Sequence, residues 1–95
     1  MQIILNGKTY ESPAPKARMV REAVEITEEI DFGDIKAKDI DKLVNYVVKL
    51  YDNNFSIDDV YDGLEAEKLI PTLTESIEGV LGKMGAKLEE FPKNE

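Results

Sequence analysis

Residues 55–71 read FSIDDVYDGLEAEKLIP, and this stretch carries most of the chain's signals for starting and stopping a helix. Ser56 is a favourable N-cap, because its hydroxyl can accept a backbone N–H of the first turn. Asp59 lies three residues later and can accept the N–H of the cap in return, which completes a capping box. Phe55 and Val60 have the spacing of a hydrophobic staple. A well-capped helix is therefore expected to begin after the cap.

The same stretch also indicates where this helix ends. Gly63 is expected to end it, since glycine adopts the left-handed conformation of a helix C-terminus without steric cost. Pro71 is expected to interrupt or restart the helical pattern beyond it, because proline lacks the amide hydrogen and clashes with the preceding turn. Residues 56–62 are thus predicted to form a short elbow between two longer helices.

Composition narrows the classes of function. The 95 residues suffice for one domain, predicted over residues 1–95. The net charge is −8, with 20 carboxylates against 12 basic side chains, which argues against nucleic-acid binding. The chain contains no histidine and no cysteine, so a neutral-pH base, a thiolate nucleophile and a disulfide are all excluded. These features suit a protein that binds other proteins.

The first residues, MQIILNGK, lack the basic start and the apolar stretch of a signal peptide. No apolar run approaches the roughly 20 residues of a membrane span. We therefore expect no membrane association and a cytoplasmic location.

A β-hairpin is predicted over residues 1–12. Residues 2–5 are mostly apolar, and Asn6 and Gly7 supply the positive φ angles of a type I′ turn. Residues 8–12 form the return strand. Because a two-stranded ribbon is marginal alone, its apolar side chains are expected to lie on a helix or on another chain's strand; these are Ile3, Leu5 and Tyr10.

Helical periodicity extends from residue 16 to residue 88. It predicts a helix over residues 16–30 with Arg18, Arg21, Glu22, Glu25, Glu28 and Glu29 on its outer face. It also predicts a very buried helix over residues 36–53, a turn at Asn53 and Asn54, the short elbow, and a C-terminal helix that starts near Pro71. Residues 89–95 are expected to be a loose tail. The predicted fold is α+β, mostly α: a hairpin followed by about four helices in a compact bundle.

The C-terminal helix carries a narrow apolar stripe close to heptad spacing. Its members are Leu73, Ile77, Val80, Leu81, Met84 and Leu88. Two interpretations stay open: the stripe packs inside the domain, or it forms a surface for a partner or for self-association. Gly79, Gly82 and Gly85 weaken the helix, so either its end frays or another helix approaches closely.

Three short matches to functional motifs fail. Asp52, Asn54, Ser56 and Asp58 imitate a calcium loop, but Ile57 and Gly63 occupy the positions that need glycine and glutamate. Asp31, Phe32 and Gly33 spell a kinase motif without its companions, so Gly33 is interpreted as a helix-ending glycine. The DGL of residues 62–64 is similar to the attachment site of acyl carrier proteins, but glycine replaces the modified serine. No catalytic, cofactor or metal site is predicted.

Three segments in the same order carry a family resemblance: IILNGKTY, PAPKARM and FSIDDVYDGL. With these segments the chain resembles the tail assembly chaperones of long-tailed bacteriophages with non-contractile tails, from about Ile3 to Leu88. The resemblance implies a non-enzymatic protein of the host bacterial cytoplasm. It also implies that the protein binds the tape measure protein and keeps it soluble, contacts the tail tube protein, and forms a homo-oligomer.

Under this interpretation the partner or self-contact surface consists of Ile77, Val80, Leu81, Met84 and Leu88, backed by Tyr61 and Leu64. The alternative from another class is a small acidic regulator, such as an antirepressor or antitoxin that sequesters one protein. An enzyme ranks third, because adjacent acids such as Asp58 and Asp59 diverge on a helix instead of converging on a substrate.

Overall fold

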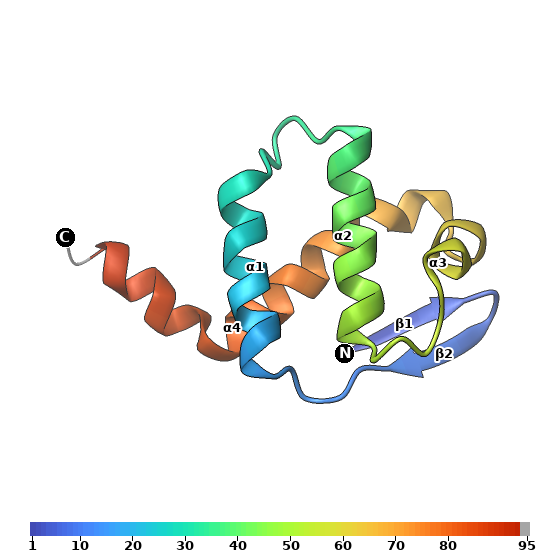
Figure 1. Ribbon diagram of the computed structural model, residues 1–95, viewed down its shortest axis with the longest axis horizontal. Helices are drawn as coiled ribbons and strands as arrows, with labels where there is room; N and C mark the ends of the chain where they lie inside the picture. Colours follow the sequence, from blue (N-terminus) through green and yellow to red (C-terminus); the bar gives the residue numbers. More distant parts are fainter. Residues whose placement is uncertain (94–95) are drawn as a thin grey trace.

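The computed structural model describes the backbone of residues 1–93 and the surroundings of the side chains of residues 1–82. Within this part the chain forms β1 (Gln2–Leu5), β2 (Lys8–Glu11), α1 (Ala17–Glu29), α2 (Ala37–Leu50), α3 (Ile57–Gly63), the 3-10 turn η1 (Ala66–Lys68) and α4 (Leu69–Lys93). Figure 1 shows α1 and α2 side by side, α4 crossing behind them, and the hairpin with α3 next to α2. The predicted mostly helical α+β fold is confirmed.

The hairpin has the predicted turn and register. β1 and β2 pair antiparallel with Leu5 opposite Lys8, which leaves a two-residue turn. Asn6 and Gly7 have φ angles of 52° and 80°, the left-handed conformation that a type I′ turn requires at both positions. The local sequence therefore determines the register.

The inner face of the hairpin packs on the helices. Ile3 and Leu5 are 3% exposed and belong to the main core. The ring of Tyr10 meets the ring of Phe55 edge-on, with centroids 4.9 Å apart. The helical body thus supplies the support that a two-stranded ribbon needs.

α1 ends at Glu29 without a glycine. Ile30 is its buried C-cap, and Gly33 lies three residues further on with a negative φ. The Gly33 amide donates a 2.9 Å hydrogen bond to the carboxylate of Asp31. The prediction that Gly33 ends the helix is therefore wrong, because the side chain of Asp31 organises this turn.

α2 is the most buried helix, as predicted. Its buried residues are Leu43, Val44, Tyr46, Val47, Val48 and Leu50, and it packs against α1, α3 and α4. It ends at Leu50, three residues earlier than predicted. Asp52 and Asn53 have φ angles of 60° and 57°, which an α-helix cannot continue. The turn therefore begins at Tyr51, two residues before its predicted start at Asn53.

α3 has the predicted N-terminal structure. The amide of Asp59 donates to the hydroxyl of Ser56 at 3.1 Å, and the amide of Ser56 donates to the carboxylate of Asp59 at 2.9 Å. Phe55 and Val60 are both buried, as a staple requires. The capping box and the staple are confirmed.

Gly63 has a different role from the predicted one. It is the last residue of α3 and its φ is negative, so it is not a left-handed cap. A Cβ at this position would lie 3.1 Å from the Cβ of Leu5 and 3.2 Å from the side-chain nitrogen of Asn6. The Gly63 carbonyl also accepts a 3.0 Å hydrogen bond from the Asn6 amide. Glycine suits this position because a Cβ would force the neighbouring atoms of Leu5 and Asn6 to shift by a few tenths of an ångström.

α4 begins at Leu69, two residues before Pro71, so the proline does not start the helix. It occupies the first turn, where a missing amide hydrogen costs little because that group has no partner within the helix. Gly79 faces the N-terminus, since an added Cβ would lie 3.0 Å from the sulfur of Met1. The close neighbour is therefore the first residue and not another helix. The surroundings of Gly85 lie outside the described part, so the expectation for it stays a prediction. The tail expected to be loose over 89–95 overlaps the end of α4, whose helical backbone continues to Lys93, and residues 94–95 lie outside the described part.

Two glycine variants test the contact between the hairpin and α3. Gly63→Ala should lower the free energy of unfolding by about 1–3 kcal/mol, because the new methyl group overlaps Leu5 and Asn6. Gly82→Ala is the matched control, since a Cβ there meets nothing within 4 Å. It should raise that free energy by up to about 1 kcal/mol through helix propensity. Urea denaturation measures both, and a Gly63→Ala protein as stable as the parent would contradict the close approach.

Candidate protein-binding surface

The apolar stripe of α4 is divided between the core and the surface. Ile77 and Val80 are 3% and 0% exposed, so both belong to the core of this chain. Leu81 is only partly buried. Met84 and Leu88 lie beyond the side chains that the structure describes. The partner surface stays a prediction, and Leu81 is a described member that remains accessible.

Tyr61 and Leu64 were predicted to back the partner surface. Tyr61 is 38% exposed on α3, and its hydroxyl donates to the carboxylate of Asp41 on α2. Burial and this hydrogen bond raise the pKa of Tyr61 to about 12. Leu64 is partly buried and lines a hollow together with Ile4 of the hairpin and with Pro71, Thr72 and Glu75 of α4. Their place behind the partner surface therefore stays a prediction.

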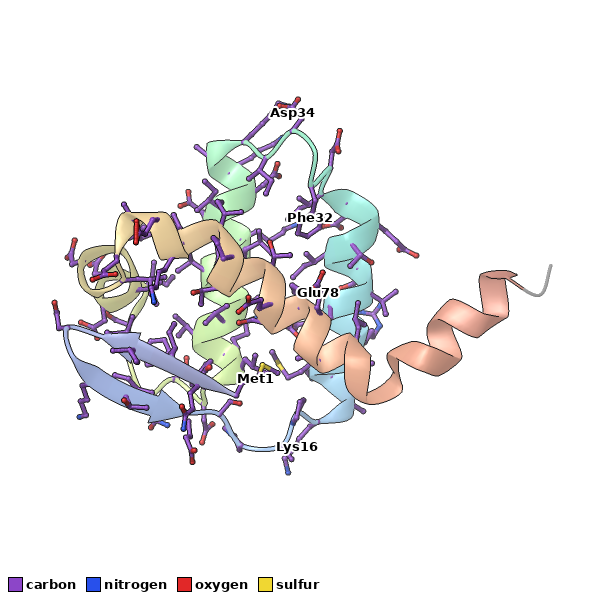
Figure 2. The ribbon with its side chains drawn as sticks, turned by 180° about the vertical axis from the view of Figure 1, so that it is seen from behind. Met1, Lys16, Phe32, Asp34 and Glu78 are labelled. Carbon is purple, nitrogen blue, oxygen red and sulfur yellow. The ribbon has the colours of Figure 1, made fainter. Side chains whose placement is uncertain are left out.

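An apolar groove opens beside the accessible part of the stripe. It has a volume of about 210 Å³ and a mainly apolar wall. We call it the Phe32 groove; its lining residues are Thr27, Phe32, Thr74, Ile77, Glu78 and Leu81. Figure 2 shows Phe32, from the loop after α1, close to Glu78 on α4. The groove therefore joins two segments that are far apart in the sequence.

The loop after α1 holds Phe32 in place. Ile30 is buried before it and Ile35 is partly buried after it, so both ends of the loop are anchored to the core. Between them the Asp34 amide donates to the Asp31 carbonyl at 2.9 Å. Sequence reasoning missed Phe32 as a surface residue. The available signal was a large aromatic side chain within a polar loop, which is unusual enough to indicate a contact.

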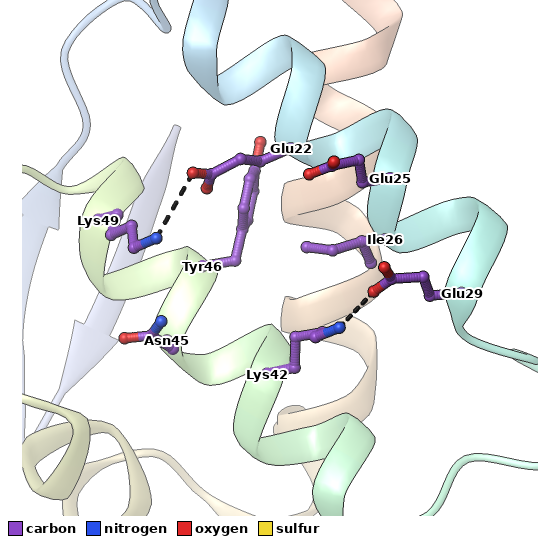
Figure 3. A pocket seen from close by; sticks show the side chains of 8 residues that line it. All are labelled: Glu22, Glu25, Ile26, Glu29, Lys42, Asn45, Tyr46 and Lys49. Atoms are coloured by element: carbon purple, nitrogen blue, oxygen red, sulfur yellow. Dashed lines mark hydrogen bonds and ion pairs between the residues drawn. The ribbon is translucent and has the colours of Figure 1, made fainter.

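A second hollow, of about 250 Å³, lies between α1 and α2 and has a charged lining (Figure 3). Two ion pairs cross it: Lys42 with Glu29, and Lys49 with Glu22 at 3.5 Å. The hydrogen bond to Glu29 raises the pKa of Lys42. Glu22 and Glu25 were predicted to point outward, but both are half-buried because α2 packs along that side of α1. Because the pairs are largely exposed, they align the two helices only weakly.

Tyr46 contributes to this hollow as a structural residue. Its side chain is 2% exposed, and its hydroxyl donates to the Met19 carbonyl at 2.7 Å. Burial, together with the negative charge of Glu22, raises the pKa of Tyr46 to about 12. The phenol is therefore protonated at neutral pH and does not act as a base.

Metal binding and membrane crossing receive no support from the described residues. Among them, no group of three or more His, Cys, Asp or Glu side chains is placed to hold a metal ion. In the same part of the chain, no helix is both long and apolar enough to cross a bilayer.

In a comparison with protein families, the model of a family described as phage tail chaperone protein aligns with residues 3–95. Comparisons with curated proteins and with solved structures give no match. The family alignment covers the hairpin, all the helices and the Phe32 groove.

The buried tyrosines should make the protein sensitive to alkali. Burial raises the pKa of Tyr46 and of Tyr51 to about 12, against about 10 in the unfolded chain. Their contribution to stability is thus complete below about pH 10 and is lost as the pH rises toward 12. When the pH is raised from about 8 to about 11, each of the two tyrosines should lower the free energy of unfolding by about 1 kcal/mol. Denaturation at both pH values measures this change for the parent and for the variants Tyr46→Phe and Tyr51→Phe, each of which should lose one tyrosine's share of it. If both variants show the same pH dependence as the parent, the prediction is contradicted.

Proposed function

The chain belongs to the phage tail chaperone protein family, and from this membership we propose that it binds the tape measure protein and keeps that protein soluble during tail assembly. The observation that carries the proposal is the family match over residues 3–95. We propose that it acts in the host bacterial cytoplasm, without catalysis, and that the tail tube protein and further copies of the chain are additional partners.

The Phe32 groove supports a helical client. The tape measure protein of this proposal is a long helical chain that displays apolar side chains until the tube surrounds it. A groove of about 210 Å³ with Phe32 and Leu81 in its wall suits one large apolar side chain of such a helix. Met84 and Leu88 come after Leu81 at intervals of three and four residues, which would extend the contact along α4.

Charge supports the same role. Each copy carries a net charge of −8, so copies bound along one client repel neighbouring complexes and oppose aggregation. Glu78 places a carboxylate at the groove, which favours apolar client segments with Lys or Arg nearby. Many weak contacts along one client would act together through multivalency, so each groove needs only modest affinity.

Coexpression with fragments that tile the tape measure protein of the same phage tests the proposal. The parent chain should hold at least one fragment in the soluble fraction and co-purify with it. Phe32→Ser should weaken that complex about tenfold or more, because it removes an aromatic anchor from the groove. Ile57→Ser is the matched control: Ile57 is 39% exposed on α3, away from the groove, and the variant should bind like the parent.

The results of this experiment distinguish an error in the proposed function from an error in the proposed binding surface. If every fragment stays insoluble and none co-purifies with the parent chain, tape measure binding is wrong. If fragments bind Phe32→Ser as tightly as the parent, the function stands but the Phe32 groove is not the surface. Denaturation of both variants checks that the bundle remains folded.

A further inference from the structure

The outer edge of β1 has open hydrogen-bonding positions. The Met1 carbonyl accepts a 2.9 Å hydrogen bond from the Ser12 amide, and Leu5 is the residue that flanks the two-residue turn. Backbone groups alternate between the two sides of an antiparallel strand. Because the N–H and C=O groups of Met1 and Leu5 point toward β2, those of Gln2 and Ile4 point outward. Among the described residues, no backbone group pairs with Gln2 or Ile4 on that outer side.

The end of α3 contacts the turn end of this edge through one main-chain hydrogen bond. The Asn6 amide, which also points outward, donates to the Gly63 carbonyl at 3.0 Å. Leu64 and Glu65 continue with extended backbone angles, φ −92° ψ 135° and φ −64° ψ 142°. The chain then turns into η1. The turn end of the edge is therefore covered by the end of α3, and among the described residues Gln2 and Ile4 have no main-chain partner on the outer side.

A groove of suitable size runs along the vacant part. Two adjoining hollows of about 330 and 390 Å³ share Ile4, Leu64 and Lys68, and Pro71 lines the far wall of the first. Each hollow falls within the range of about 300–1,000 Å³ typical of ligand sites. Ile4 is 57% exposed, which makes it a large apolar residue open to contact. Figure 2 shows β1 as the hairpin strand nearer α4, so this groove lies between β1 and the start of α4.

The lining of the groove has an excess of negative charge. Glu65, Glu67 and Glu75 contribute three carboxylates against the single amine of Lys68. This favours an incoming segment with basic side chains. The exposed side chain of Ile4 favours apolar side chains between them.

We propose that the β1 edge binds an extended segment of a partner protein, one that alternates apolar residues with Lys or Arg, by adding it as a third strand. Main-chain hydrogen bonds to Gln2 and Ile4 supply the register, and the groove selects the side chains. This site is separate from the Phe32 groove, which suits a helix. The protein would thus have one surface for helical segments and another for extended ones.

A short synthetic peptide of alternating lysine and valine is the probe. Added to the full chain, it should slow hydrogen exchange of the Gln2 and Ile4 amides about tenfold or more at saturation, as new main-chain hydrogen bonds would. The same peptide with methyl groups on the alternate amides that face β1 should give no protection. Alternating glutamate and valine should bind at least about tenfold more weakly, because of the carboxylates in the groove. Absence of protection by the first peptide, or equal protection by all three, would overturn the proposal.

Two proline variants test the edge within the protein. Ile4→Pro removes an outward amide hydrogen without breaking the β1–β2 ladder, and it should weaken peptide binding about tenfold or more. Thr9 lies opposite Ile4 and directs its backbone outward from the other edge of the hairpin. Thr9→Pro is therefore the matched control and should leave the affinity within about twofold. Equal effects of the two variants would overturn the assignment to β1, and amide spectra confirm that each hairpin is intact.

Discussion

The burial of α2 on three sides is the constraint on which the rest of the structure depends. α2 packs against α1, α3 and α4, and in a chain of 95 residues few apolar side chains remain to cover it. α4 therefore contributes Leu73, Ile77 and Val80 to the core. A small domain has few apolar side chains to divide between a packed core and a surface for a partner. The flank of that stripe remains accessible, where Leu81 meets the loop that carries Phe32.

The hairpin also has to pack against the helical body. Gly63 makes the attachment, because its missing side chain lets Leu5 approach and its carbonyl accepts the Asn6 amide. This contact also gives the outward-pointing amide next to β1, that of Asn6, its hydrogen-bond partner. It occupies the turn end of the edge and leaves the position of Ile4 exposed to solvent and to partners.

These two features fit the work of a chaperone that belongs to a phage tail family. A client-binding protein needs apolar surface, but large exposed patches promote its own aggregation. The Phe32 groove and the groove beside β1 are both small, and each has a carboxylate in its lining, Glu78 in the first and Glu75 in the second. The net charge of −8 keeps the remaining surface well hydrated.

The sequence by itself determined the features that depend on residues close together in the chain: the type I′ turn, the capping box at Ser56, and the amphipathic helices with α2 as the most buried. Only the tertiary structure decided why Gly63 is glycine, where Phe32 lies, and which part of the α4 stripe is buried. A core stripe and an interface stripe have the same periodicity, so the pattern cannot separate them. The choice between them, and the close approach of the hairpin to α3, depend on contacts between segments far apart in the chain, which no local pattern encodes.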